Sequence, residues 1–214
     1  MSLQCRVTEI FYSLQGETRT VGLPTVFVRL TGCPLRCTFC DTAYAFHGGE
    51  KRAISDIVDE VKTYQPRYVT VTGGEPLAQK TCFPLLTALC DLGVEVSLET
   101  CGAMDISEVD PRVICVMDLK TPGSGEEAKN RYDNIALLKQ TDQLKFVICN
   151  RDDYDWAVEK LQEYDLVAKC DVLFSPIHGL LNPADLADWV VADNLAVRMQ
   201  IQMHKYLWND EPGR

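Results

Sequence analysis

Three cysteines lie close together: Cys33, Cys37 and Cys40 follow a C-x3-C-x2-C pattern. Three thiolates are one short of the four ligands that close a structural zinc site. They are enough to hold three irons of a cubane [4Fe–4S] cluster, which leaves the fourth iron open to a ligand that is not protein. A zinc site completed by His47 is the alternative. The spacing therefore predicts a metal centre and favours an iron–sulfur cluster with one accessible iron.

A second candidate segment is Gly73-Gly74-Glu75-Pro76, which follows the apolar run 68–72. Two adjacent glycines let the backbone approach a ligand closely, and a carboxylate can accept hydrogen bonds from an ammonium group. Taken alone, these residues are also typical of a turn between a strand and a helix that begins with proline. Because the segment lies one strand–helix unit after the three cysteines, we expect the two to share a site.

The elements that must position these residues alternate along the chain. Apolar runs rich in β-branched residues predict strands at 24–31, 68–72, 94–99, 113–118, 143–149, 171–175 and 196–202. Helical patterns between them predict helices at 54–64, 76–92, 126–139, 153–163 and 183–193. This alternation predicts an α/β fold with a mostly parallel sheet, either open or curled into a barrel. Active sites of such folds lie where the strands end.

Composition narrows the class of protein. The 214 residues, 46% of them hydrophobic, suit one domain spanning 1–214. We find no run of about 18 apolar residues that could cross a membrane, and residues 1–10 do not resemble a secretory signal. A net charge of −10 does not favour binding to nucleic acid. We therefore expect a cytoplasmic protein with no membrane or nucleic-acid partner, whose seven scattered cysteines are buried free thiols.

The cysteine pattern, with Phe39 directly before the third cysteine, resembles the radical S-adenosylmethionine (SAM) superfamily. The resemblance implies a complete or partial (β/α) barrel. It also implies that SAM binds the open iron through its amino and carboxylate groups and is cleaved by the reduced cluster to methionine and a 5′-deoxyadenosyl radical. The segment 73–76 resembles the part of these proteins that holds the methionine amino group. We therefore expect a partial (β/α) barrel of the radical SAM type.

Flanking segments resemble the 7-carboxy-7-deazaguanine synthase family of the queuosine pathway. The similar segments are 12–17, 22–24, 27–30, 40–42, 99–102 and 202–206. The resemblance implies that the substrate is 6-carboxy-5,6,7,8-tetrahydropterin, which loses a hydrogen atom from C6 to the adenosyl radical. The ring then contracts and ammonia leaves, which gives 7-carboxy-7-deazaguanine. SAM is regenerated, and Mg2+ assists.

The resemblance also implies roles for individual residues. Pterin contacts are expected from Leu14, Gln15, Gly16, Glu17, Arg29 and Thr72. Catalytic roles are expected for Glu99 and His204. SAM contacts are expected from Phe39, Cys40, Asp41, Gly74, Glu75, Asp118, Leu119, Lys120, Ser175, Pro176, Ile177 and His178. Cys33, Cys37 and Cys40 are expected to hold the cluster, and Thr42 the Mg2+ ion.

Several of these residues have plainer interpretations. Arg29 lies in an apolar strand, where an unpaired charge is costly, so it binds either the substrate carboxylate or an internal acidic residue. Glu99 could be an exposed carboxylate at the end of a strand. Residues 118–120 depart from the family's commoner Ser-Pro-Lys, which leaves the contact with the SAM ribose open. Thr18 replaces the family's usual glycine, which predicts a stiffer first loop.

The resemblance further implies a homodimer and an electron donor of the flavodoxin or ferredoxin type, for which Arg36 is a candidate contact. Two rival functions remain. A glycyl-radical-enzyme activating enzyme shares the cysteine pattern, but it acts on a protein and needs no pterin-binding loop. A non-enzymatic iron–sulfur carrier needs neither the segment 73–75 nor an arginine inside a strand.

Overall fold

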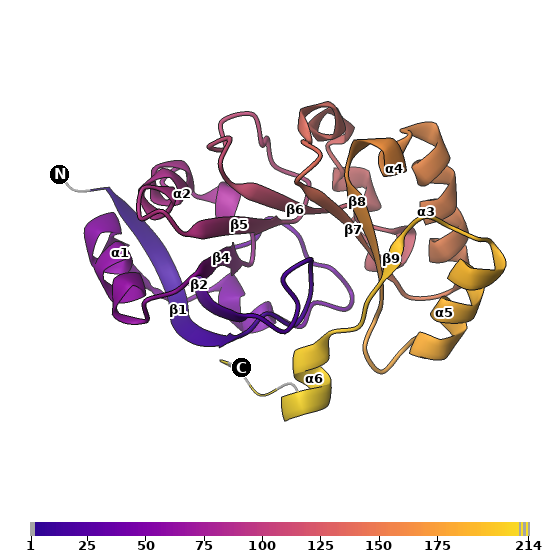
Figure 1. Cartoon of the computed structure of the whole chain (residues 1–214), viewed down its shortest axis with the longest axis horizontal. Coiled ribbons are helices and arrows are strands. Elements are labelled where there is room, and N and C mark those ends of the chain that lie inside the picture. Colours follow the sequence, from indigo (N-terminus) through magenta and orange to yellow (C-terminus); the bar gives the residue numbers. More distant parts are fainter. Residues whose placement is uncertain (1–2, 210, 212, 214) are drawn as a thin grey trace.

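A mostly parallel sheet forms the centre of the molecule in the computed structural model, which describes residues 3–209, 211 and 213 (Figure 1). The strand order is β3-β1-β2-β4-β5-β6-β7-β8-β9. The strands are β1 (Gln4–Leu14), β2 (Pro24–Leu30), β3 (Glu50–Ala53), β4 (Tyr68–Gly73), β5 (Glu95–Thr100), β6 (Ile114–Asp118), β7 (Gln143–Ile148), β8 (Asp171–Pro176) and β9 (Arg198–Met199). β1 pairs antiparallel with β2 and β3, and the other neighbours pair parallel. The expected α/β partial barrel is confirmed.

Helices follow most of the parallel strands. They are α1 (Ile54–Thr63), α2 (Cys82–Cys90), α3 (Arg151–Glu163), α4 (Leu166–Lys169), α5 (Pro183–Ala192) and α6 (Met203–Trp208). Local sequence sets their starts: the side chain of Asn182 accepts a hydrogen bond from the Ala184 amide, and Pro183 opens α5. Figure 1 shows α1 and α2 beside the first strands and α3 to α5 beside the last ones. No helix in the described part of the chain is long and apolar enough to cross a membrane.

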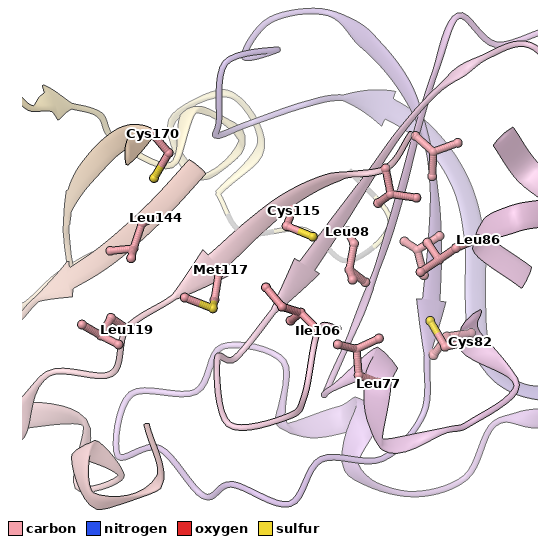
Figure 2. Packing of buried hydrophobic residues seen from close by; sticks show 14 of the residues in the cluster. Leu77, Cys82, Leu86, Leu98, Ile106, Cys115, Met117, Leu119, Leu144 and Cys170 are labelled. Atoms are coloured by element: carbon pink, nitrogen blue, oxygen red, sulfur yellow. The ribbon is translucent and has the colours of Figure 1, made fainter. Parts of the chain in front are cut away.

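The hydrophobic core lies between the sheet and these helices. Leu98 of β5 and Leu86 of α2 are fully buried in it. Figure 2 shows that Cys82, Cys115 and Cys170 point into the same packing as the leucines. All seven cysteines outside the three-cysteine loop are buried and free, which confirms their expected role as small apolar side chains.

The predicted helix over 126–139 is wrong. The segment instead forms two short 3-10 turns, Glu127–Lys129 and Tyr132–Leu137. Polar side chains explain the difference, because they bond to other loops. The Asn130 amide pairs with both backbone groups of Lys120 at 2.8 Å, and the Asn134 amide donates to the carbonyl of Met104 at 2.7 Å. Such bonds compete with a continuous helix.

Four other elements also differ from the prediction. The predicted helix 76–92 is a 3-10 turn, Pro76–Ala78, followed by α2. The predicted strand 196–202 is reduced to the two-residue β9, and the strands β1 and β3 were not predicted. These differences leave the main consequence unchanged, because the parallel strands β2 and β4 to β8 all end at one edge of the sheet.

Candidate active site

A cavity of about 240 Å³ lies at the carboxyl edge of the parallel strands. It is lined by residues from the loops that follow the strands and from the C-terminal segment. The predicted site residues that border it are Leu14, Gln15, Gly16, Glu17, Arg29, Cys33, Cys37, Phe39, Cys40, Asp41, Thr42, Thr72, Gly74, Glu99, Asp118, Lys120, Ser175, Pro176, Ile177 and His204. Residues far apart in the sequence thus meet in one place.

The three cysteines lie in the loop that follows β2, and close backbone contact fixes this loop against the turn after β4. A Cβ atom on Gly74 would collide with the carbonyl oxygen of Gly32 and lie 2.8 Å from Cβ of Cys33. A glycine is therefore required where the two loops meet. Burial raises the pKa of the Cys33 and Cys37 thiols, whereas the nearby Lys120 ammonium favours their thiolates.

The thiols border the cavity together without converging on one point. Among the described residues, no three His, Cys, Asp or Glu side chains are placed to hold a single metal ion. His47, the suggested fourth zinc ligand, is not among the residues that line the cavity. In a [4Fe–4S] cluster each thiolate binds a different iron, so the ligands are spread apart. The residues present therefore fit such a cluster better than a zinc ion.

A polar network lies on the side of the cavity formed by β4 and β5. The Gln15 amide donates to Glu99 Oε1 at 3.3 Å and to Thr70 Oγ1 at 3.2 Å. The Thr72 hydroxyl donates to Glu99 Oε2 at 2.8 Å. Burial raises the pKa of the Glu99 carboxyl, although the Lys145 ammonium opposes the shift. This arrangement presents an amide and a carboxyl group that can exchange protons and hydrogen bonds with a ligand.

Arg29 lies on β2 beside this network. Its Nε donates to Glu9 Oε1 at 2.7 Å, and the Tyr44 hydroxyl donates to the same oxygen at 2.8 Å. The guanidinium carbon lies 5.8 Å from the Phe11 ring centroid and 5.7 Å from that of Tyr44. The internal salt bridge considered from the sequence is therefore present. Because this salt bridge uses Nε, it leaves the terminal guanidinium nitrogens of Arg29, a residue that lines the cavity, available to a second partner.

Charged side chains from β6, β7 and the loop after β1 form an ion-pair network that borders the same cavity. Lys120 Nζ lies 2.6 Å from Asp118 Oδ2, and Lys145 Nζ lies 3.3 Å from Asp118 Oδ1 and 2.9 Å from Glu17 Oε2. Despite burial, the two ammonium groups lower the pKa of Asp118. Lys145 was not predicted as a site residue. Its signal in the sequence is a lysine inside the apolar run of β7.

The C-terminal segment lies across the cavity and joins two of its loops. Gln202 Nε2 donates to Glu17 Oε1 at 2.8 Å and to Asp41 Oδ2 at 3.1 Å. Lys205 Nζ lies 3.1 Å from the same Asp41 oxygen. His204 packs against Gly16 so closely that a Cβ atom there would collide with its Nδ1. The loop after β1, the cysteine loop and the C-terminal segment are thus held together beside the predicted cluster.

Ser175, at the end of β8, offers an unused polar atom. Its side chain is 3% exposed and borders the cavity, and its Oγ has no hydrogen-bond partner among the described residues. A buried hydroxyl without a partner is costly. Its position therefore fits a ligand with polar groups, as the predicted SAM contact requires.

Three predicted SAM contacts do not border the cavity. Glu75 is fully buried and accepts bonds from the Thr100 hydroxyl at 2.9 Å and the Cys101 amide at 2.6 Å, so its carboxylate fixes neighbouring loops. Leu119 points into the core (Figure 2). His178 borders a second cavity of about 340 Å³ and packs edge-on against Tyr206. Sequence spacing places these residues beside the site, but it does not give the direction of their side chains.

Comparisons with known proteins agree with this geometry. The model of the radical SAM superfamily matches residues 27–116, which include the three cysteines and the turn after β4. The crystal structure of QueE from Escherichia coli superposes with a TM-score of 0.76 at 23% identity and covers 94% of this chain and 95% of that one. Streptococcus suis SuiB superposes with a TM-score of 0.60 at 16% identity over 80% of this chain and 46% of that one. The match identifies a radical SAM domain that includes the cysteine loop, and the superpositions show its fold.

Relatives identify the family more closely. The 7-carboxy-7-deazaguanine synthase of Chlorobaculum tepidum is 43% identical over 96% of this chain and 94% of that protein. The synthase of Koribacter versatilis is 40% identical over 96% of this chain and 98% of that protein. The chain belongs to the 7-carboxy-7-deazaguanine synthase family. Membership in the radical SAM superfamily implies a [4Fe–4S] cluster and SAM as cofactors.

Proposed function

We propose that this enzyme converts 6-carboxy-5,6,7,8-tetrahydropterin to 7-carboxy-7-deazaguanine with loss of ammonia, and that residues 1–214 act as one domain. The observation that carries the proposal is the composition of one cavity. Three thiols border one side of it, and the network of Gln15, Thr72 and Glu99 borders another. A radical source and a polar heterocycle would therefore lie within one cavity.

The cluster would be held by Cys33, Cys37 and Cys40. When bound, the cluster and SAM supply a 5′-deoxyadenosyl radical that can remove a hydrogen atom from carbon. The chain's own residues bind and orient SAM: the backbone at Gly74 allows its close approach, and the unpartnered Ser175 hydroxyl offers a hydrogen bond. Asp118 offers a carboxylate that two lysines keep ionised, which suits a ribose hydroxyl group.

The pterin would lie against the other wall. Gln15 and Glu99 suit its amide and guanidine-like edge, because they present a donor and an acceptor side by side. The terminal nitrogens of Arg29 suit its carboxylate, with Glu9 and Tyr44 fixing the guanidinium plane. The raised pKa of Glu99 suits a group that holds or releases a proton as the ring contracts. His204 would contact the pterin from the C-terminal side.

Mg2+ would be bound by Thr42. Its hydroxyl donates to Asp41 Oδ1 at 2.9 Å and borders the cavity, so the oxygen lone pairs lie close to the proposed substrate. Mg2+ often takes few protein ligands and completes its shell with substrate and water. A single hydroxyl ligand from the protein is consistent with this coordination preference.

We further propose a cytoplasmic homodimer that receives electrons from a flavodoxin or ferredoxin. Arg36 is the proposed contact for this electron-transfer partner. Its guanidinium donates a hydrogen bond to the carbonyl of Cys33 at 2.8 Å, so its charge lies near the proposed cluster. It also lies 4.2 Å from the centroid of the Phe46 ring, which holds it in place. An acidic donor would meet a fixed positive charge there.

The test is an anaerobic turnover assay. The reconstituted enzyme receives SAM, dithionite and the carboxytetrahydropterin, and products are followed by mass. We expect 7-carboxy-7-deazaguanine with SAM in catalytic amounts. Formation of 5′-deoxyadenosine without this product would contradict the substrate and favour an activating enzyme that acts on a protein.

A further inference from the structure

Lys145 is a charged side chain in an apolar strand. It lies in β7 between Leu144 and Phe146, which are both fully buried, and its own side chain is 14% exposed. It borders the cavity, and its Nζ lies 2.9 Å from Glu17 Oε2 and 3.3 Å from Asp118 Oδ1. One ammonium group therefore contacts the loop after β1 and the end of β6.

These two carboxylates belong to segments that are proposed to bind different ligands. Glu17 lies in the segment proposed to bind the pterin, and its other oxygen accepts a hydrogen bond from Gln202 at 2.8 Å. Asp118 lies in the segment proposed to bind SAM, and its other oxygen accepts one from Lys120 at 2.6 Å. Because each carboxylate is already held on its far side, Lys145 sets the distance between the two segments.

Electrostatics explains why a lysine is suited to this position. Two carboxylates at one cavity repel each other, and a buried charge without a partner is costly. Burial favours the neutral form of Lys145, but Asp118 and Glu17 outweigh it and hold the pKa of the amine well above its usual range. The side chain therefore stays an ammonium and is a poor proton donor. Its role is to hold geometry.

We infer that Lys145 is a positioning residue that fixes the segment proposed to bind the pterin relative to the segment proposed to bind SAM. The inference rests on the proposed function and deepens it. Hydrogen transfer needs closely placed reacting atoms, and a displacement of about 1 Å can slow a reaction about 100-fold. Without the charge of Lys145, Glu17 and Asp118 separate, so hydrogen removal from the pterin slows. SAM cleavage needs only the segment that binds SAM and continues.

The test is to measure 5′-deoxyadenosine and 7-carboxy-7-deazaguanine in the same anaerobic reaction. In Lys145→Met we expect the ratio of deoxyadenosine to product to rise about tenfold or more over wild type. Lys145→Arg keeps the charge and should restore the ratio toward the wild-type value. Lys62→Met on α1, whose side chain is 53% exposed, is the matched surface control and should leave the ratio unchanged. Cluster absorbance and melting temperature establish that the variants are folded and loaded.

A wild-type ratio in Lys145→Met would overturn the inference, and so would equal ratios in the Met and Arg variants. If Lys145→Met does not load the cluster, Lys145→Gln carries the same prediction, because it keeps a hydrogen-bond donor without the charge. Failure of the proposed function gives a different result: the wild-type enzyme itself forms no 7-carboxy-7-deazaguanine.

Discussion

Basic side chains inside apolar strands border both sides of the cavity. Arg29 interrupts β2 and Lys145 interrupts β7, and each has buried apolar neighbours in its strand. Such a charge needs a partner, so the pattern itself predicts an ion pair or a ligand. The sequence drew attention to Arg29 because a recognisable segment contains it. Only the folded chain reveals that the partners of Lys145 come from segments near residues 17 and 118.

At Arg29 we predict a specific effect on the pterin. Lysine keeps the charge but loses the planar fork that binds a carboxylate with two hydrogen bonds. In Arg29→Lys we expect pterin affinity to fall about 10- to 100-fold, which corresponds to about 1.4–2.8 kcal/mol. SAM binding should be unchanged. Both affinities can be measured on the reconstituted enzyme without reductant.

The matched control is Arg67→Lys, because Arg67 is exposed and also lies over an aromatic ring, that of Tyr68. This variant should bind pterin as the wild type does. Unchanged pterin affinity in Arg29→Lys would remove the proposed carboxylate contact.

The raised pKa of the Glu99 carboxyl predicts that the stability of the protein depends on pH. Burial raises the pKa of its carboxyl in the folded protein above the ordinary value of 4.5. Between the unfolded and folded pKa values, the folded state holds a proton that the unfolded state has released. The free energy of unfolding therefore falls as pH rises through this window. Above the window, Glu99→Gln should be more stable than wild type by about 1.4 kcal/mol for each unit of pKa shift.

Thermal and urea unfolding between pH 4 and pH 8, with the cluster state matched, measures this difference. The gap between Glu99→Gln and wild type should close as pH falls below the window. A gap that does not change with pH would show that Glu99 does not titrate as described.

At the scale of elements, the sequence predicted the parallel strands and the loops that follow them. Strands of a parallel sheet are buried on both faces, so they are recognisable as runs of apolar, β-branched residues. It missed β1, whose residues are mostly half-buried and mix polar with apolar side chains. It also failed over 126–139, where Asn130 and Asn134 bond to distant loops. Most residues that line the cavity were predicted from the sequence. The directions in which the side chains of Glu75 and His178 point could not be predicted, because they depend on packing.

The contact between the first loop and the C-terminal segment predicts a steric effect. Gly16 does not have a positive φ, so alanine is compatible with its backbone, but the added Cβ would collide with His204. In Gly16→Ala we expect turnover to fall about tenfold or more, because His204 is displaced from the cavity. The melting temperature should change little. Turnover and thermal unfolding of the same preparation check both statements.

A double-mutant cycle is the control for this prediction. If the collision acts through His204, Gly16→Ala should cause little further loss of turnover in a His204→Ala background. Additive losses from the two substitutions would contradict a direct contact as the cause.

At the scale of the whole molecule, the sheet is open, and contacts between the C-terminal segment and the loop after β1 form one wall of the cavity. β3 and β9 are its edges, and the segment after β9 reaches the loop after β1 through Gln202 and through the Met203 amide, which donates to the Gly16 carbonyl at 3.0 Å. The core between the sheet and the helices is made of buried apolar side chains. The cavity therefore combines a well-packed wall with a C-terminal wall held by polar contacts.

The core should carry much of the stability. Leu98 is fully buried on β5, so Leu98→Ala removes apolar contacts and leaves a cavity. We expect the free energy of unfolding to fall by about 2–5 kcal/mol in urea titrations of the cluster-free chain. Leu207→Ala, at a side chain that is 51% exposed, should change it by less than about 0.5 kcal/mol. Equal effects of the two substitutions would contradict the assignment of the core.

The central claim is that one cavity places C6 of the pterin against SAM. The direct measurement uses the carboxytetrahydropterin with deuterium at C6, in the anaerobic reaction with unlabelled SAM. Because SAM is regenerated in the proposed reaction, we predict that recovered SAM carries deuterium while 7-carboxy-7-deazaguanine accumulates. Product formed while recovered SAM stays free of deuterium would contradict the claim.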